Sequence, residues 1–212
     1  MERVRKEAFW LYGVIVGLAV REALTITVPH FALKSQVVAW MVRLEAWRLV
    51  VFLAVIVRFY LGSATYFDKV YDNPETADSV PKKNYSLDYI LGFLNFLMFF
   101  GWSATIPVPD RLMLGISQYL WFLTAIILFD AVWLIVSWKY DSTKFIKGWV
   151  FYNVSTFLIC ALIFAVTEGI SGNSVLAEEL AFPFILLISA VDIIEVTRGK
   201  QYLLDFLRRT FS

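Results

Sequence analysis

The chain has 212 residues, of which 59% are apolar, 17% are aromatic and 17% are charged. An average soluble domain is about 45–50% apolar and about 25% charged, so this composition excludes an ordinary soluble domain and indicates a membrane protein. The formal net charge of +1 gives no basis for nucleic-acid binding through bulk charge. The single cysteine, Cys160, and the single histidine, His30, rule out an intrachain disulfide and fall short of a zinc site, so we expect no metal and no cofactor.

Six apolar stretches are each about as long as the roughly 20 helical residues that cross a bilayer. The sequence therefore predicts an all-α polytopic membrane protein that forms a single transmembrane helical domain over 1–212. The predicted helices cover 7–28, 37–64, 87–106, 112–138, 148–168 and 178–197. A cytoplasmic loop is predicted at 68–86 and a basic amphipathic C-terminus at 198–212.

The first predicted helix follows a basic segment, as the apolar run of a signal peptide does. Arg21 and Glu22 interrupt its far end, however, and no small-residue cleavage site follows, so we interpret it as a retained membrane helix. Its Gly13 and Gly17 have a GxxxG spacing. Such a spacing lets a second backbone approach closely or leaves a smooth wall beside a pore.

The distribution of basic residues orients the predicted helices across the membrane. Lys and Arg concentrate in the cytoplasmic loops of membrane proteins. Six spans place both termini on one side, and most of the 19 Lys and Arg residues fall in the two termini and in the second-to-third and fourth-to-fifth loops. The opposite side carries Lys34, Arg43 and Arg111. We therefore expect both termini to be cytoplasmic.

Several charged side chains lie within the predicted helices. Burying one in hydrocarbon costs at least about 2.5–3.5 kcal/mol, so each needs a partner or a watery path. For the inner half of the bundle the sequence predicts an intramembrane charge cluster of Arg58, Asp88, Asp130 and Asp192. Arg58 is its expected hub, because one guanidinium can serve two carboxylates. Two interpretations stay open: an ion-pair staple that holds the bundle together, or a role in gating or conduction.

Neutral polar residues in the predicted helices are typical of hydrogen bonds between helices; they are Asn95, Gln118 and Asn153. Enzyme chemistry finds little support. An intramembrane serine protease needs a base for its nucleophile, and His30 lies at a helix end. Asp130 and Asp192 lie at similar depths in the membrane and could share a proton as the two aspartates of an aspartyl protease do. Neither of them, however, lies in a Gly-x-Gly-Asp motif. We expect the protein not to be an enzyme.

Two stretches of the chain carry a resemblance. Lys6-Glu7-Ala8-Phe9 is followed after one extra residue by Gly13, and the first helix closes at Val28-Pro29. In the third helix Leu94-Asn95-Phe96-Leu97 leads to the corner Pro107-Val108-Pro109. These stretches resemble the small six-helix potassium channels of bacteria and lysosomes. In that family the first helix opens with a basic residue and Glu-Ala-Phe-Ser-Asp-Gly, and Leu-Asn-x-Leu ends in a Pro-Phe-Pro corner.

The chain departs from that family at its hallmark, because Trp10-Leu11-Tyr12 stands where Ser-Asp belongs. Potassium selectivity is therefore not carried over. The resemblance implies a homotetramer whose first helices line a central pore, with aliphatic side chains at the constriction. A ring of Ile15 or of Leu18 would gate such a pore by dewetting. The candidate pore-lining residues are Phe9, Gly13, Ile15, Val16, Gly17, Leu18 and Glu22.

We expect a small homo-oligomeric channel or ion-flux protein that conducts monovalent ions, with cations as the expected species and helix 1 as the pore lining. We expect it to lie in the plasma (inner) membrane, in contact with membrane lipid. We do not expect it to bind nucleic acid. The alternative is a non-conducting integral membrane subunit. In that case the loop 68–86 and the C-terminus would dock a soluble cytoplasmic partner.

Overall fold

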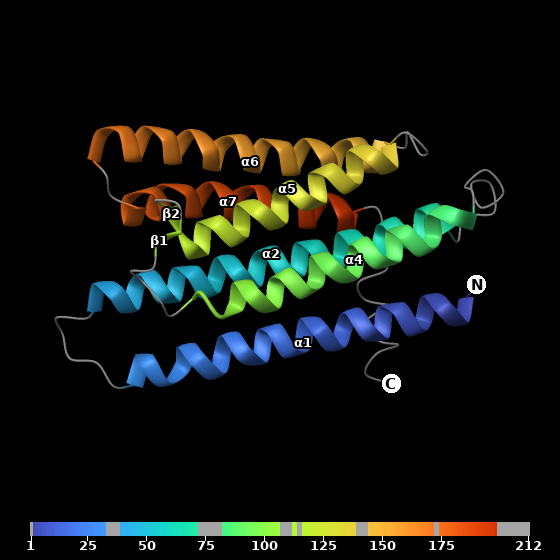
Figure 1. The fold of residues 1–212 in the computed structure, drawn as a ribbon, viewed down its shortest axis with the longest axis horizontal. Helices are drawn as coiled ribbons and strands as arrows, with labels where there is room; N and C mark the ends of the chain where they lie inside the picture. The colour runs from blue at the N-terminus through green and yellow to red at the C-terminus, as the bar shows by residue number, and fades with distance from the viewer. Residues whose placement is uncertain are drawn as a thin grey trace.

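The computed structural model describes residues 2–32, 39–71, 82–106, 112–113, 116–138, 144–171 and 174–198. Most of these residues lie in six long helices, which confirms the expected all-α fold (Figure 1). The helices are α1 (Glu2–Ala32), α2 (Ala39–Tyr71), α4 (Lys82–Ser103), α5 (Gln118–Trp138), α6 (Lys144–Ser171) and α7 (Ser174–Arg198). A small antiparallel hairpin, β1 (Leu112–Met113) and β2 (Ile116–Ser117), precedes α5.

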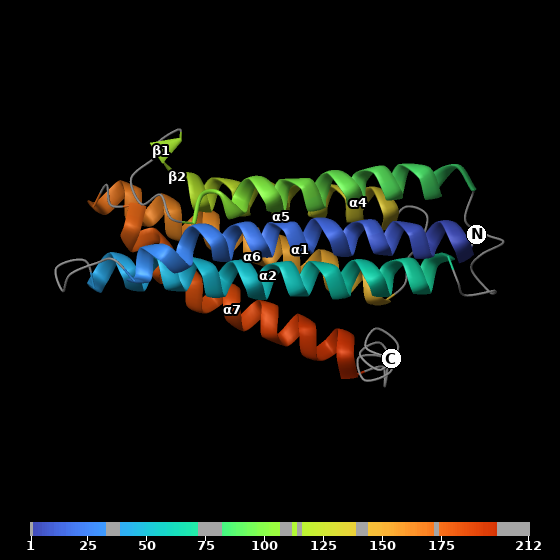
Figure 2. The same ribbon diagram turned by 90° about the horizontal axis from the view of Figure 1, so that it is seen from below.

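The six helices pack side by side in a closed ring, in the order α1, α2, α7, α6, α5, α4 and back to α1. Successive helices run up and down the bundle, so α1 begins and α7 ends at the same end (Figure 1). We call this end, which contains the start of α1, the inner end, and the opposite one the outer end. α2 and α7 run in the same direction, and α7 crosses the other helices at an angle (Figure 2).

Five helices are long and apolar enough to cross a membrane, and the described apolar part of α4, Leu87–Ser103, is slightly shorter. The chain is therefore a multi-pass membrane protein. The five spans are Trp10–Thr27, Leu44–Phe67, Gln118–Val136, Lys147–Thr167 and Leu176–Thr197. Within the span of α2 56% of the residues are buried, against 28% in α1, α6 and α7, so α2 is the most enclosed of these helices.

The helices extend beyond the apolar stretches that the sequence predicts. α2 continues to Tyr71 and α4 begins at Lys82, so the predicted loop 68–86 is helical at both edges, and 72–81 lies outside the described residues. A helix satisfies its own backbone hydrogen bonds and has no need to end where the hydrocarbon does. The expected amphipathic C-terminus also lies outside the described residues beyond Arg198, the last residue of α7.

The predicted fourth helix, 112–138, begins later than expected. In the structure Leu112 pairs with Ser117 and Met113 with Ile116 in the hairpin, and helix α5 starts at Gln118. The predicted helix includes this segment because a short apolar run has no periodicity that separates a strand from a helix.

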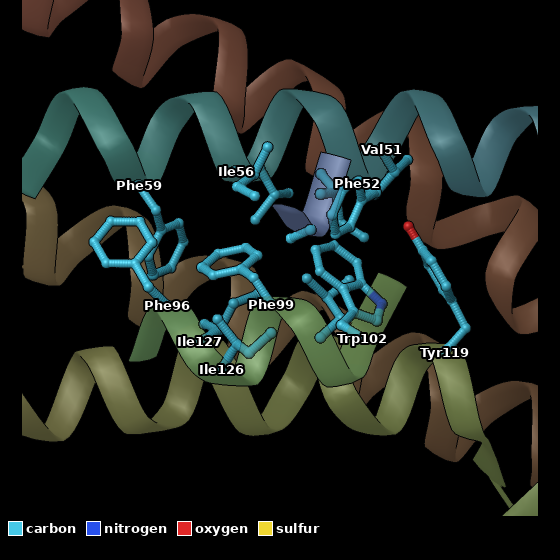
Figure 3. Packing of buried hydrophobic residues seen from close by; sticks show 14 of the residues in the cluster. Val51, Phe52, Ile56, Phe59, Phe96, Phe99, Trp102, Tyr119, Ile126 and Ile127 are labelled. Atoms are coloured by element: carbon cyan, nitrogen blue, oxygen red, sulfur yellow. The ribbon is translucent and has the colours of Figure 1, made fainter. Parts of the chain in front are cut away.

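Aromatic side chains fill the centre of the ring. The ring centroids of Phe59 and Phe99 lie 5.3 Å apart, and those of Phe52 and Trp102 lie 5.2 Å apart. All four side chains are fully buried. Figure 3 shows residues of α2, α4 and α5 pointing toward one another in this core: Phe52, Ile56, Phe59, Phe96, Phe99, Trp102, Ile126 and Ile127. The core is therefore closely packed between the two ends of the bundle.

Candidate functional site

A buried polar network, which we call the inner network, crosses the bundle from α7 to α4. Its members are Asp192 of α7, Arg58 of α2, Asn153 of α6, Asp130 of α5 and Asn95 of α4. All five side chains are buried, with exposed fractions of 4% or less. Each lies on the face of its helix that packs against neighbouring helices, so one network ties five of the six helices together.

Arg58 is the cation of the inner network. Its Nε donates to Asp192 Oδ2 over 2.5 Å, and its Nη2 donates to Asn153 Oδ1 over 2.7 Å. Its Nη1 is buried without a hydrogen-bond partner among the described residues. Removing one partner of such a buried ion pair costs several kcal/mol of stability, because the remaining charge is then buried without a counter-charge.

Asp130 belongs to the inner network without touching Arg58. Asn153 Nδ2 donates to its Oδ2, and Asn95 Nδ2 donates to its Oδ1 over 3.1 Å. Asn153 thus bridges the guanidinium and Asp130, since its amide oxygen accepts from Arg58 while its amide nitrogen donates to the carboxylate. The direct partners of Asp130 are neutral amides.

Asp88 does not join the other three members of the predicted charge cluster. Its Oδ2 accepts from Tyr66 Oη over 2.7 Å and its Oδ1 accepts from Trp133 Nε1 over 2.9 Å. These contacts join α4 to α2 and α5 nearer the inner end. Asp88 and Asn95 are two helical turns apart on α4, so the two polar sites lie along one interface at different depths.

A second buried ion pair lies toward the outer end. Arg48 of α2 donates from Nε and Nη2 to the two oxygens of Glu178 on α7, over 2.6 and 2.7 Å. Its Nη1 also donates to the carbonyl oxygen of Ile106 over 3.3 Å, just after the end of α4. Arg48 therefore serves both as an ion-pair cation and as a hydrogen-bond donor to the turn that follows α4.

Tyr119 of α5 completes this outer site. Its ring lies 5.5 Å from the guanidinium carbon of Arg48, and its Oη donates to the backbone oxygen of Arg48 over 2.7 Å. Glu178 is not among the predicted site residues, because the predicted sixth helix, 178–197, begins at that residue. α7 begins one turn earlier, at Ser174, and this turn places Glu178 inside the bundle with no exposed surface.

The candidate pore-lining residues lie on different faces of α1. Ile15 is buried in its own chain, and Val16, Gly13 and Glu22 are half-buried. Gly17 and Leu18 are exposed on the outside of the ring. The side chain of Phe9 lies outside the described residues. Among the candidates whose burial the structure describes, Gly17 and Leu18 are therefore the ones that a single chain leaves uncovered.

The outward face of α1 differs in chemistry from the middle of the outward face of α6. It carries the charged Arg21, for which the described residues offer no ion-pair or hydrogen-bond partner, inside the apolar span Trp10–Thr27. Nothing lies within 4 Å of a Cβ placed on Gly17. After the exposed Lys147 near its start, the large side chains exposed on the described part of α6 are, in contrast, apolar ones suited to lipid: Phe151, Leu158, Leu162 and Val166.

The described residues contain no group of three or more His, Cys, Asp or Glu side chains that could hold a metal ion. Cys160 is free and buried on α6. The chemistry that the described residues offer is therefore charge pairing and hydrogen bonding inside the bundle, together with the charged outward face of α1.

Comparison of the chain with protein-family models, curated proteins and solved structures gave no match. The resemblance to the small six-helix potassium channels is thus untested and stays a prediction.

Proposed function

We propose that the chain assembles with copies of itself into an ion-flux protein in which monovalent ions pass along the outward face of α1. The observation that carries this proposal is Arg21, which is exposed within the apolar span of α1 and has no partner among the described residues. Charged residues in membrane spans rarely face lipid, and they mark ion pathways or contacts between helices.

Two further features support a path outside the ring of a single chain. The aromatic core fills the centre of the bundle between the inner network and the Arg48–Glu178 pair, so the described residues leave no continuous polar route through the interior of one chain. On α1, Gly17 adds a position without a side chain, which lets a neighbouring backbone approach or leaves room beside a pore. Leu18 lies next to it and supplies an aliphatic group for a dewetting constriction.

The proposed membrane is the plasma (inner) membrane, with both termini on the cytoplasmic side. The support for this orientation is the excess of Lys and Arg in the segments that meet at the inner end. The proposed ions are monovalent: a ring of the half-buried Glu22 would concentrate cations, whereas a ring of the exposed Arg21 beside it would concentrate anions, so the flux assay has to cover both signs.

The proposal is tested by ion flux into liposomes that contain the purified, assembled protein. We expect flux from the wild type and a higher flux from Leu18→Asn, because an amide at an aliphatic constriction draws water into it. Leu162→Asn is the matched control, since Leu162 lies on the apolar outward face of α6 and should leave flux unchanged.

The rival function is a non-conducting membrane subunit that docks a soluble partner. One observation favours it: the buried Arg48 and Arg58 of α2 each have a carboxylate partner within the chain, as a purely structural staple requires. Liposomes that pass neither potassium, sodium nor chloride with wild type, Leu18→Asn and Leu162→Asn would refute ion flux and leave this alternative.

A further inference from the structure

The inner network holds more acid than base. It contains two carboxylates, Asp130 and Asp192, and one guanidinium, Arg58. No other Lys or Arg among the described residues forms an ion pair or a hydrogen bond with either carboxylate. With both carboxylates ionised, the three groups would carry one uncompensated negative charge inside the bundle.

The geometry places that excess charge on Asp130. Asp192 binds the guanidinium of Arg58 directly, with 2.5 Å between Arg58 Nε and Asp192 Oδ2, whereas Asp130 is connected to the guanidinium only through the Asn153 amide. An ionised carboxylate that is buried away from water with only neutral partners is far more costly than a carboxylic acid, so such a group takes up a proton. Asp130 has no exposed surface, which places it in this situation.

The two side-chain amides beside Asp130, those of Asn153 and Asn95, differ in whether they can rotate without losing hydrogen bonds. Asn153 is fixed, because its Oδ1 accepts from Arg58 and its Nδ2 must then face Asp130 Oδ2. Asn95 donates from Nδ2 to Asp130 Oδ1, and its own Oδ1 is buried without a hydrogen-bond partner. A half-turn of the Asn95 amide brings that oxygen to face Asp130 Oδ1, where it can accept a hydrogen bond from a carboxylic acid.

We propose that Asp130 binds one proton on Oδ1, held by a hydrogen bond to the Asn95 amide oxygen. The proton comes from water, so Asp130 changes from a charge of −1 to neutral and the three-group total changes from −1 to zero. Asn95 serves both states: its nitrogen donates to the carboxylate, and its oxygen accepts from the acid. This proton site does not depend on ion flux.

The groups around Asp130 fit a proton better than a metal cation. Those that face it across the packed helices are Arg58 of α2, Asn95 of α4, Asn153 of α6 and, through Arg58, Asp192 of α7. Glu195 follows Asp192 by one turn at the exposed edge, where it accepts from Tyr152 Oη. A bound sodium or potassium ion needs several oxygen ligands at once, whereas the Asn153 amide nitrogen faces Asp130 Oδ2 whichever way the Asn95 amide is turned.

Infrared spectroscopy of the purified full chain tests the site, because a protonated carboxyl group has a C=O band that an ionised one lacks. At neutral pH we expect such a band in the wild type and its loss in Asp130→Asn, whose side chain imitates the neutral acid. Asp88→Asn is the control and should leave that band in place, because Asp88 lies in a separate contact.

Asp192→Asn gives the discriminating result. It removes the direct partner of Arg58, so the guanidinium becomes the counter-charge of Asp130 and the proton is no longer required. We expect the Asp130 band to disappear in Asp192→Asn although Asp130 itself is unchanged. Asn95→Leu should keep the band and shift its frequency, because the acid loses its hydrogen-bond acceptor.

Three results would overturn the proposal. The first is a wild-type spectrum at neutral pH without a band that Asp130→Asn removes, and the second is a band that persists unchanged in Asp192→Asn. The third is a thermal stability that rises with sodium or potassium, compared with choline at equal ionic strength, in the wild type but not in Asp130→Asn. That last result would mean that a metal cation, and not a proton, neutralises the network.

Discussion

Arg58 shows how one side chain can determine the packing of several helices. Its guanidinium contacts α7 through Asp192 and α6 through Asn153, and Asn153 carries the connection on to α5. A charge in this position is stable only with its partners, since hydrocarbon offers no alternative. The inner network therefore specifies which faces of these helices meet.

Replacing Arg58 should expose this dependence. We expect Arg58→Ala to lower the free energy of unfolding by about 3–5 kcal/mol, because Asp192 is left buried without its cation. Thermal unfolding in detergent measures the loss.

The double variant Arg58→Ala/Asp192→Asn should recover part of this stability, whereas Arg58→Ala/Asp88→Asn should recover none, because Asp88 bonds to Tyr66 and Trp133 instead. Equal losses in the single and both double variants would mean that the Arg58–Asp192 contact does not stabilise the fold.

The depth of Arg58 and of its carboxylate partners could be predicted from the sequence, but their pairing could not. Asp88, Asp130 and Asp192 all fall toward the inner half of their helices. Which of them meets Arg58 depends on how each helix is rotated, and the apolar stretches of a membrane helix define that rotation weakly. Glu178 was missed for a related reason, since its burial depends on a helical turn that begins before the apolar run.

Among the elements, α2 is packed most closely against its neighbours. Gly62 of α2 lies against the indole of Trp149 on α6, and a Cβ at this glycine would be 2.7 Å from Trp149 Cζ2. Trp149 is itself buried, so the indole has little room to move away. The approach of α2 to α6 at this point therefore depends on the absence of a side chain.

We expect Gly62→Ala to lower stability by about 1–3 kcal/mol, the usual cost of overpacking a core. Gly148→Ala is the matched control in α6, because nothing lies within 4 Å of a Cβ at that position. The two midpoints of thermal unfolding give the comparison. A Gly62→Ala midpoint equal to that of Gly148→Ala would contradict the close α2–α6 contact.

At the scale of the whole molecule, the ring of six helices places the start of α1 and the end of α7 at one end (Figure 1). The all-α class, the six helices and five of the six expected spans could be predicted from composition and from the lengths of the apolar stretches. The closed order of the helices could not, because α2 and α7 are distant in sequence and meet through contacts such as Arg48 with Glu178 and Arg58 with Asp192.

The orientation of the ring is tested with single cysteines in a Cys160→Ala background. We expect Ser79→Cys and Ser142→Cys to be shielded from an impermeant thiol reagent in intact cells, because the segments that contain them connect helices at the inner end. Ser171→Cys, at the outer end of α6, should react. Labelling of Ser79→Cys from outside would reverse the orientation.

The central functional claim is that ions pass along the outward face of α1, and thiol block of flux tests it most directly. Leu18→Cys and Leu162→Cys are each placed in a Cys160→Ala background, reconstituted in liposomes and treated with a bulky polar thiol reagent. We predict that the reagent abolishes most of the flux through Leu18→Cys and leaves the flux through Leu162→Cys unchanged. Confirmed labelling of Leu18→Cys without any loss of flux, or the same loss in both variants, would contradict a path along α1.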